Sequence, residues 1–186
     1  YQATVNSADT TETAAREVAQ ALGADFHVWE IDPLVAGYRK MVEGSLGREL
    51  SWETDDLALQ NIQARVRAPG VWMMANLRNA LLLATSNRSE AAVGYATMDG
   101  DTCGGLSPIG GIDKAFLREW LRWMESEGGE GIPALPALSF INVQAPTAEL
   151  RPLESAQTDE GDLMPYPVLD AIERHAIRDK KLDHEL

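Results

Sequence analysis

The sequence predicts an α/β fold in which helices flank a parallel sheet. Residues 9–31 run from a helical pattern through a glycine turn into a short apolar segment, which is half of a repeating α/β unit. Residues 80–85 form an apolar run that leads into Ser-Asn, as expected of a buried parallel strand whose carboxyl end opens into a polar loop. Open parallel sheets bind their ligands beyond these carboxyl ends.

The first elements follow from caps, apolar spacing and helix breakers. Asp9 and Glu12 have the spacing of an N-terminal capping box, and Gly23 suits the end of the helix that they begin. Pro69-Gly70 is expected to kink or end a later helix. The same signals predict a strand over residues 26–31, helices over 34–42, 55–68, 71–78 and 167–178, a helix capped by Asp113, and loops over 43–51 and 86–111.

Length and charge limit the class of protein. The 186 residues suit one domain, and 16 Lys and Arg against 29 Asp and Glu give a formal net charge of −13. This balance argues against a protein whose main role is to bind a nucleic-acid backbone, but it is compatible with a bound nucleotide. The absence of a signal peptide and of a membrane-length apolar segment, with one cysteine in the chain, predicts a cytoplasmic protein without a membrane partner.

Single candidate sites are weak when taken one by one. Asn61 and Arg65 lie four residues apart and share a helix face, but a solvated polar face explains them as well. Glu90 follows the carboxyl end of the predicted strand, where a ligand would bind. Lys114 follows two glycines without the spacing of a Walker loop. Cys103 has no histidine nearby in the sequence, so an unremarkable thiol is the simpler interpretation.

The motifs become specific when their order is considered. They are Asn-Ile-Gln-Ala-Arg at 61–65, Ala-Thr-Ser-Asn-Arg-Ser-Glu at 84–90, Gly-Tyr-Ala-Thr at 94–97, Pro-Ile-Gly-Gly-Ile-Asp-Lys at 108–114, Pro-Thr-Ala-Glu-Leu at 146–150 and Gln-Thr-Asp-Glu at 157–160. This ordered set resembles the synthetase domain of NAD synthetase, an ATP-pyrophosphatase-type amide ligase, over most of residues 5–178. The longer form found in glutamine-dependent members is the more similar one.

The resemblance implies a Rossmann-like parallel sheet of the adenine-nucleotide alpha-hydrolase type, flanked by helices and lacking its first strands. Residues 1–186 would be a single NAD-synthetase-like domain, truncated at the N-terminus and at the C-terminus. The family's phosphate-gripping Ser-Gly-Gly-x-Asp-Ser loop does not occur in the sequence, nor does its basic C-terminal segment. We therefore expect the chain to be inactive alone.

The resemblance also implies a reaction and its participants. The nicotinate carboxylate of deamido-NAD would attack ATP to give an adenylate and pyrophosphate, and ammonia would then displace AMP. No side-chain nucleophile is required, whereas Mg²⁺ and cations would stabilise the leaving pyrophosphate. By position, Thr85, Lys114 and Thr147 would bind ATP, Glu90 would ligate magnesium, and Arg65 would hold deamido-NAD. The family further implies a homodimer, with a glutaminase domain supplying ammonia in the full-length enzyme.

Two positions depart from the family pattern, and two other functions stay open. Met98 stands where many members have a Lys, and Gly105 stands where they have an Asp that contacts deamido-NAD, so neither is assigned a role. Another adenylating amidotransferase, similar to GMP synthetase, is the second hypothesis. A non-catalytic dimerisation module, with the apolar helix around residues 72–74 as its partner surface, is the third.

Overall fold

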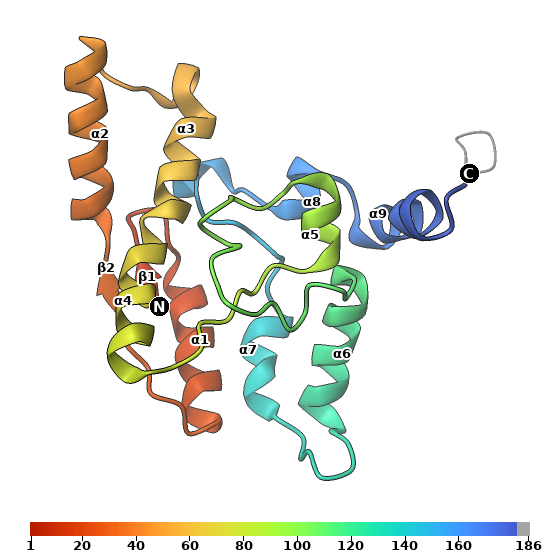
Figure 1. Ribbon diagram of the computed structural model, residues 1–186. Helices are drawn as coiled ribbons and strands as arrows, with labels where there is room; N and C mark the ends of the chain where they lie inside the picture. Colours follow the sequence, from red (N-terminus) through yellow and green to blue (C-terminus); the bar gives the residue numbers. More distant parts are fainter. Residues whose placement is uncertain (182–186) are drawn as a thin grey trace.

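Helices make up most of the computed structural model, which describes residues 1–181 (Figure 1). The chain begins with the predicted α/β unit. β1 (Gln2–Ala3) leads through α1 (Asp9–Ala21) to β2 (Trp29–Glu30), and the two strands pair in parallel. Gly23 ends the helix with a φ of +65°, as its place after the apolar pattern predicts. Ala8 rather than Asp9 is the N-cap, and no side chain caps the helix, so the predicted capping box of Asp9 and Glu12 is wrong.

The apolar run at residues 80–85 does not form the buried strand that it predicts. The N–H of Ala84 donates to the carbonyl of Leu106, and the N–H of Gly105 donates to the carbonyl of Leu82, each over 2.8 Å. Within residues 1–181 these two hydrogen bonds form a single parallel bridge between Leu83 and Leu106, and the pairing does not continue as a ladder. Leu83 is 49% exposed.

Three helices follow β2, and two of their boundaries differ from the prediction. They are α2 (Asp32–Leu46), α3 (Trp52–Arg65) and α4 (Arg67–Arg78). α2 continues through Gly44 and ends at Gly47, whose φ is +69°, so the predicted loop is shorter. The break between α3 and α4 falls at Val66 instead of Pro69-Gly70. Pro69 lies in the first turn of α4, where its missing N–H breaks no helical hydrogen bond.

The second half of the chain carries shorter helices around α6. The helices are α5 (Arg88–Val93), α6 (Lys114–Ser126), α7 (Ser139–Asn142), α8 (Asp159–Asp162) and α9 (Tyr166–Glu173), with single turns η1 (Pro136–Leu138) and η2 (Leu153–Ser155). α9 continues as one π-helical turn, η3 (Arg174–Arg178), so the predicted last helix is confirmed within one residue at its start. In Figure 1, α6 lies beside α7, and α5 lies between α6 and α8.

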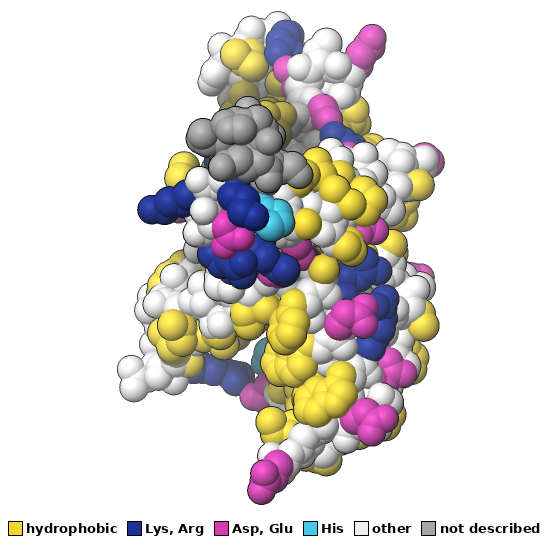
Figure 2. Space-filling model, turned by 90° about the vertical axis from the view of Figure 1, so that its right-hand side faces the viewer, with side chains coloured by type: hydrophobic (Ala, Val, Ile, Leu, Met, Phe, Trp, Pro, Cys, Tyr) yellow, Lys and Arg dark blue, Asp and Glu magenta, His cyan; other side chains and the backbone are white. Residues whose placement is uncertain are grey.

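The core is built from small and medium-sized side chains, and α6 leaves aromatic rings uncovered. Leu117 of α6 is buried, whereas Phe116, Trp120 and Trp123 are 60%, 40% and 43% exposed. Figure 2 views the molecule from the side of α6 and α9 and shows hydrophobic side chains gathered over its lower part. Among residues 1–181, no helix combines the length and the apolar character that crossing a bilayer requires.

An ion pair at the start of α3 predicts how stability depends on pH. Both terminal nitrogens of Arg48 donate to Asp55, over 2.7 and 2.6 Å, and the N–H of Ser51 adds a third hydrogen bond. Arg48, first among these donors, holds the pKa of Asp55 well below its ordinary value of 3.8. A carboxyl whose pKa is depressed by folding stabilises the native state above its unfolded pKa, and this contribution is lost as pH falls towards the folded value.

We therefore expect Asp55→Asn to lower the urea midpoint at pH 7 and to converge on the wild type as pH falls below about 4. Glu130→Gln, which alters an exposed carboxylate after α6, is the control and should shift the midpoint little at either pH. A constant difference between Asp55→Asn and wild type from pH 7 to pH 2.5 would contradict the assignment.

Candidate functional site

The site starts where residues 80–85 lead into α5. Asn87 caps this helix by accepting the N–H of Glu90 over 3.1 Å, and Glu90 Oε2 accepts the N–H of Asn87 over 3.2 Å in return. The hydroxyl of Ser86 donates to the same oxygen of Glu90. This capping box fixes the Glu90 carboxylate at the end of the segment and leaves Oε1 to face outward from the cap.

Lys114, the first residue of α6, meets that oxygen. Its Nζ lies 2.8 Å from Glu90 Oε1 and 3.9 Å from Asp159 Oδ2. The ammonium also lies 5.6 Å from the centre of the Tyr166 ring, within reach of a cation–π interaction. Two carboxylates and an aromatic face therefore surround one partly buried cation.

Asp159 and Tyr166 close the inner side of this group. Asp159 is 5% exposed, Tyr166 is fully buried, and the Tyr166 hydroxyl donates to Asp159 Oδ2 over 2.8 Å. Asp159 Oδ1 is buried and has no hydrogen-bond partner among residues 1–181. Burial raises the pKa of Asp159 above its ordinary value, because little water is present to stabilise the charge. The same loss of water, with the Asp159 contact, raises the pKa of Tyr166.

A cavity of about 330 Å³ opens beside Lys114. Thr147 lines it from the opposite side, together with residues of α1 and α7. Arg118 and Arg122 follow Lys114 at intervals of four residues and line the same cavity, whereas no acidic side chain of residues 1–181 does. Each of these cations is paired with a carboxylate outside the cavity lining: Lys114 with Glu90, Arg118 with Glu160 and Arg122 with Glu119.

The structure brings some of the expected site residues together and separates others. Glu90 and Lys114 are in contact, and Lys114 and Thr147 line one cavity. Thr85 is exposed at the end of the apolar run. Arg65 is exposed as well and donates through Nε to the carbonyl of Met98 over 3.1 Å. It lines two other cavities, of about 610 and 460 Å³, so the single shared pocket expected from the sequence is only partly formed.

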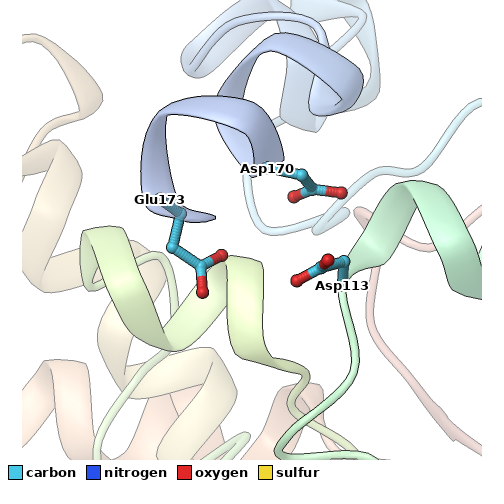
Figure 3. Close-up of side chains that lie close together, drawn as sticks. All are labelled: Asp113, Asp170 and Glu173. Atoms are coloured by element: carbon cyan, nitrogen blue, oxygen red, sulfur yellow. The ribbon is translucent and has the colours of Figure 1, made fainter. Parts of the chain in front are cut away.

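Three buried or half-buried carboxylates gather between α5, α6 and α9 (Figure 3). Carboxylate oxygens of Asp113, Asp170 and Glu173 lie within 4.8 Å of one another. Arg88 pairs with Asp113 and, over 2.6 Å, with Glu173, and Arg174 approaches Asp113 to 3.5 Å. Ion pairs with these two arginines account for Asp113 and Glu173, whereas Asp170 accepts the hydroxyl of Ser89 and the N–H of Ala115.

Comparisons with known proteins decide the family. A family model described as NAD synthase matches residues 3–186. The chain belongs to the NAD synthase family. A glutamine-dependent NAD(+) synthetase of Rhodobacter capsulatus is 38% identical over 178 residues, which cover 91% of this chain and 30% of that protein.

Comparison with solved structures of NAD synthetases supports the same family assignment. A crystal structure of a glutamine-dependent NAD(+) synthetase from Cytophaga hutchinsonii has a TM-score of 0.79 and 45% identity, covering 97% of this chain and 27% of that one. The enzyme from Acinetobacter baumannii, solved in complex with ADP, shares the fold with a TM-score of 0.63 at 24% identity, over 99% of this chain and 30% of that one. The Rossmann-like α/β fold expected from the resemblance is thus confirmed. The chain spans less than a third of these relatives.

Sequence reasoning found Glu90, Lys114 and Thr147 through NAD synthetase motifs but assigned no role to Asp159 or Tyr166. Asp159 belongs to the Gln-Thr-Asp-Glu motif, so the resemblance was a signal that could have singled it out. Tyr166 stands between two prolines at the start of the last helix, where nothing in the spacing indicates a contact with Lys114.

Proposed function

We propose that this chain is one NAD-synthetase-like domain and supplies the ATP site of an AMP-forming ligase that converts deamido-NAD to NAD. The observation that carries the proposal is the Lys114–Glu90 pair, set beside a cavity that Lys114 shares with Thr147. Membership of the NAD synthase family supports the choice of reaction, and the names of the relatives favour it over a GMP-synthetase-like amidotransferase. The ADP complex of the Acinetobacter enzyme supports ATP as the co-substrate.

In the proposed reaction the chain positions two nucleotides and stabilises charge. The nicotinate carboxylate attacks the α-phosphorus of ATP, and pyrophosphate leaves with the electron pair of the broken bond. Lys114 lines the same cavity as Thr147, and its ammonium would offset the negative charge that develops on the phosphates. Thr147 and Thr85 supply hydroxyls to ATP, and Arg65 holds deamido-NAD through its guanidinium. Ammonia then attacks the acyl carbon, and AMP leaves.

Mg²⁺ is the cation that we propose for Glu90. The donor set fits a hard cation, because Glu90 offers a carboxylate and, within the described residues 1–181, Asp159 Oδ1 is a buried oxygen without a hydrogen-bond partner. When bound, Mg²⁺ would neutralise phosphate charge. The part of this chain is to hold that cation by Glu90 and to keep Lys114 beside it.

The direct test is to supply the protein, purified at its natural length, with ATP, Mg²⁺, deamido-NAD and ammonium. We expect NAD, AMP and pyrophosphate in equal amounts. Amidation of a different acid would overturn the substrate assignment. Calorimetry of the 186-residue chain with Mg·ATP separates the binding role from the non-catalytic alternative: heat of binding supports the ATP site, and its absence in a chain that dimerises supports the dimerisation module.

Glu90→Gln is expected to raise the magnesium concentration required for half-maximal rate at least about tenfold, because a neutral amide is a poorer ligand than a carboxylate. The amide oxygen can still accept the N–H of Asn87, so the capping box is kept, whereas the ion pair with Lys114 is lost and the melting temperature should fall. Glu53→Gln on α3 is the matched control on an exposed site. An unchanged magnesium requirement would remove Glu90 from the metal site.

Three further points are proposed with this function. The protein acts in the cytoplasm, ammonia reaches the site from a glutaminase domain as the glutamine-dependent relatives' names suggest, and two copies form a homodimer. α2 has no buried residue and exposes Leu34, Tyr38 and Met41 along one side, which supports its use between copies. Sedimentation equilibrium tests the dimer, and a monomer at 100-fold the working concentration would contradict it.

A further inference from the structure

We infer that Asp170 is a positioning residue that, together with Ser89, fixes the first turn of α6 and thereby places Lys114. The inference rests on the function proposed for Lys114. Asp170 lies on α9, 56 residues beyond Lys114 in the chain, and it does not reach the Lys114 ammonium or the cavity. It acts on the backbone that carries the lysine.

The start of α6 lacks a cap from its own segment. Asp113 occupies the N-cap position, but its carboxylate makes no capping hydrogen bond and pairs with Arg88 instead. The first N–H groups of a helix have no partner within the helix, so another group must accept them when they are not exposed to water. Both Lys114 and Ala115 are partly buried at this point.

Two side chains from other helices supply the missing acceptors. The N–H of Lys114 donates to Ser89 Oγ over 2.8 Å, and the N–H of Ala115 donates to Asp170 Oδ2 over 2.9 Å. The Ser89 hydroxyl in turn donates to Asp170 Oδ1. Asp170 therefore accepts one hydrogen bond from α6 directly and orients the serine that accepts the other.

Burial strengthens the dependence of α6 on these hydrogen bonds. Ser89 is fully buried and Asp170 is 3% exposed, so water cannot replace either partner. A carboxylate at a helix N-terminus also interacts favourably with the helix dipole. Figure 3 shows the Asp170 side chain extending from α9 towards the start of α6, above Asp113 in that view.

The arrangement ties both ends of Lys114 to consecutive residues of α5. Its backbone N–H is held by Ser89, and its ammonium lies 2.8 Å from the carboxylate of Glu90. Asp170, on α9, contacts both sides of this arrangement, because it accepts the hydroxyl of Ser89 and the N–H of Ala115. If the first turn of α6 shifts, the lysine moves relative to both Glu90 and the cavity, and a misplacement of about 1 Å at a reacting group can cost on the order of 100-fold in rate.

The experiment compares Asp170→Ala, Asp170→Asn and Glu173→Gln in two measurements on the purified protein. Glu173 is the matched control, because it lies on the same helix, is 5% exposed, and contacts Arg88 but neither amide of α6. The first measurement is amide hydrogen exchange at Lys114 and Ala115. The second is the affinity for Mg·ATP by calorimetry, with Lys114→Ala as the reference for a lost lysine.

We expect Asp170→Ala to raise amide exchange at both residues and to weaken Mg·ATP binding about tenfold. Asp170→Asn keeps an oxygen for Ala115 and should stay within about threefold of the wild type. Both measurements are made well below the melting temperatures of the two variants, so that unfolding does not contribute to either result. Glu173→Gln should leave amide exchange and Mg·ATP affinity unchanged.

Each outcome bears on one claim. If Asp170→Ala binds Mg·ATP like Glu173→Gln while Lys114→Ala does not bind it, the positioning role is wrong and the proposed function stands. If the Asp170→Ala and wild-type amides exchange at the same rate, the cap is wrong. If wild type and Lys114→Ala bind Mg·ATP equally, the function proposed for Lys114 fails, and the positioning role fails with it.

Discussion

Replacing Lys114 by Ala is expected to lower kcat/KM for the ligase reaction by at least about 100-fold, through loss of charge stabilisation in the transition state. Among residues 1–181, Glu90 is the one partner within hydrogen-bonding distance of the Lys114 ammonium, and Lys114 lines a cavity that Arg118 and Arg122 also line. Without its ammonium, the Glu90 carboxylate faces the phosphates uncompensated. Pyrophosphate release in the presence of ATP, Mg²⁺, deamido-NAD and ammonium measures the effect.

Two further variants separate charge from folding. Lys114→Arg keeps a cation and should recover part of the rate, although its planar guanidinium reaches Glu90 in another geometry. Lys40→Ala removes the same side chain from an exposed position on α2 and should leave the rate unchanged. Wild-type kcat/KM in Lys114→Ala would exclude the lysine from the reaction.

Replacing Tyr166 by Ala is expected to lower the free energy of unfolding by about 3–5 kcal/mol, as for other large buried aromatic residues. The ring is fully buried at the start of α9, and its hydroxyl is the hydrogen-bond donor to Asp159. Tyr166→Phe keeps the packing but leaves the buried carboxylate without that donor, at an expected cost of about 1–3 kcal/mol. Urea unfolding at pH 7 measures both.

The control is Phe140→Ala, because Phe140 is 43% exposed on α7 and should change the free energy of unfolding by less than about 1 kcal/mol. Equal losses for Phe140→Ala and Tyr166→Ala would show that burial at α9 does not govern stability. A loss in Tyr166→Phe as large as that in Tyr166→Ala would assign the whole effect to the hydroxyl.

Local signals in the sequence predicted local structure. Gly23 ends α1 in the left-handed region as expected, and Asp113 is the residue before α6. The break at Pro69-Gly70 was misplaced, because proline is tolerated in a first helical turn and the spacing cannot tell that turn from a last one. The strand predicted over residues 80–85 is wrong for a different reason: the segment around Leu106 pairs with it over one bridge only, and the apolar pattern of a segment does not show whether a partner strand runs beside it.

In the candidate site, too, contacts within one segment were predictable from the sequence, whereas contacts between distant segments were not. Asn87 and Glu90 form a capping box over three residues, and the motif that contains them was recognisable. The role of Asp170 depends on a hydrogen bond to Ser89 across 81 residues, and that of Tyr166 on a ring placed beside Lys114. Such contacts follow from how helices dock, which no spacing within one segment encodes.

The cap of α6 has a consequence for the order in which the protein is assembled. Ser89 is made before α6, but Asp170 emerges from the ribosome 55 residues after Ala115, whose N–H it accepts. During synthesis the N–H of Ala115 at the start of α6 therefore stays hydrogen-bonded to water until α9 has been made. Lys114 takes its final place only when translation has passed α9, so the Lys114–Glu90 pair is completed after the helices from α1 to α8 have been made.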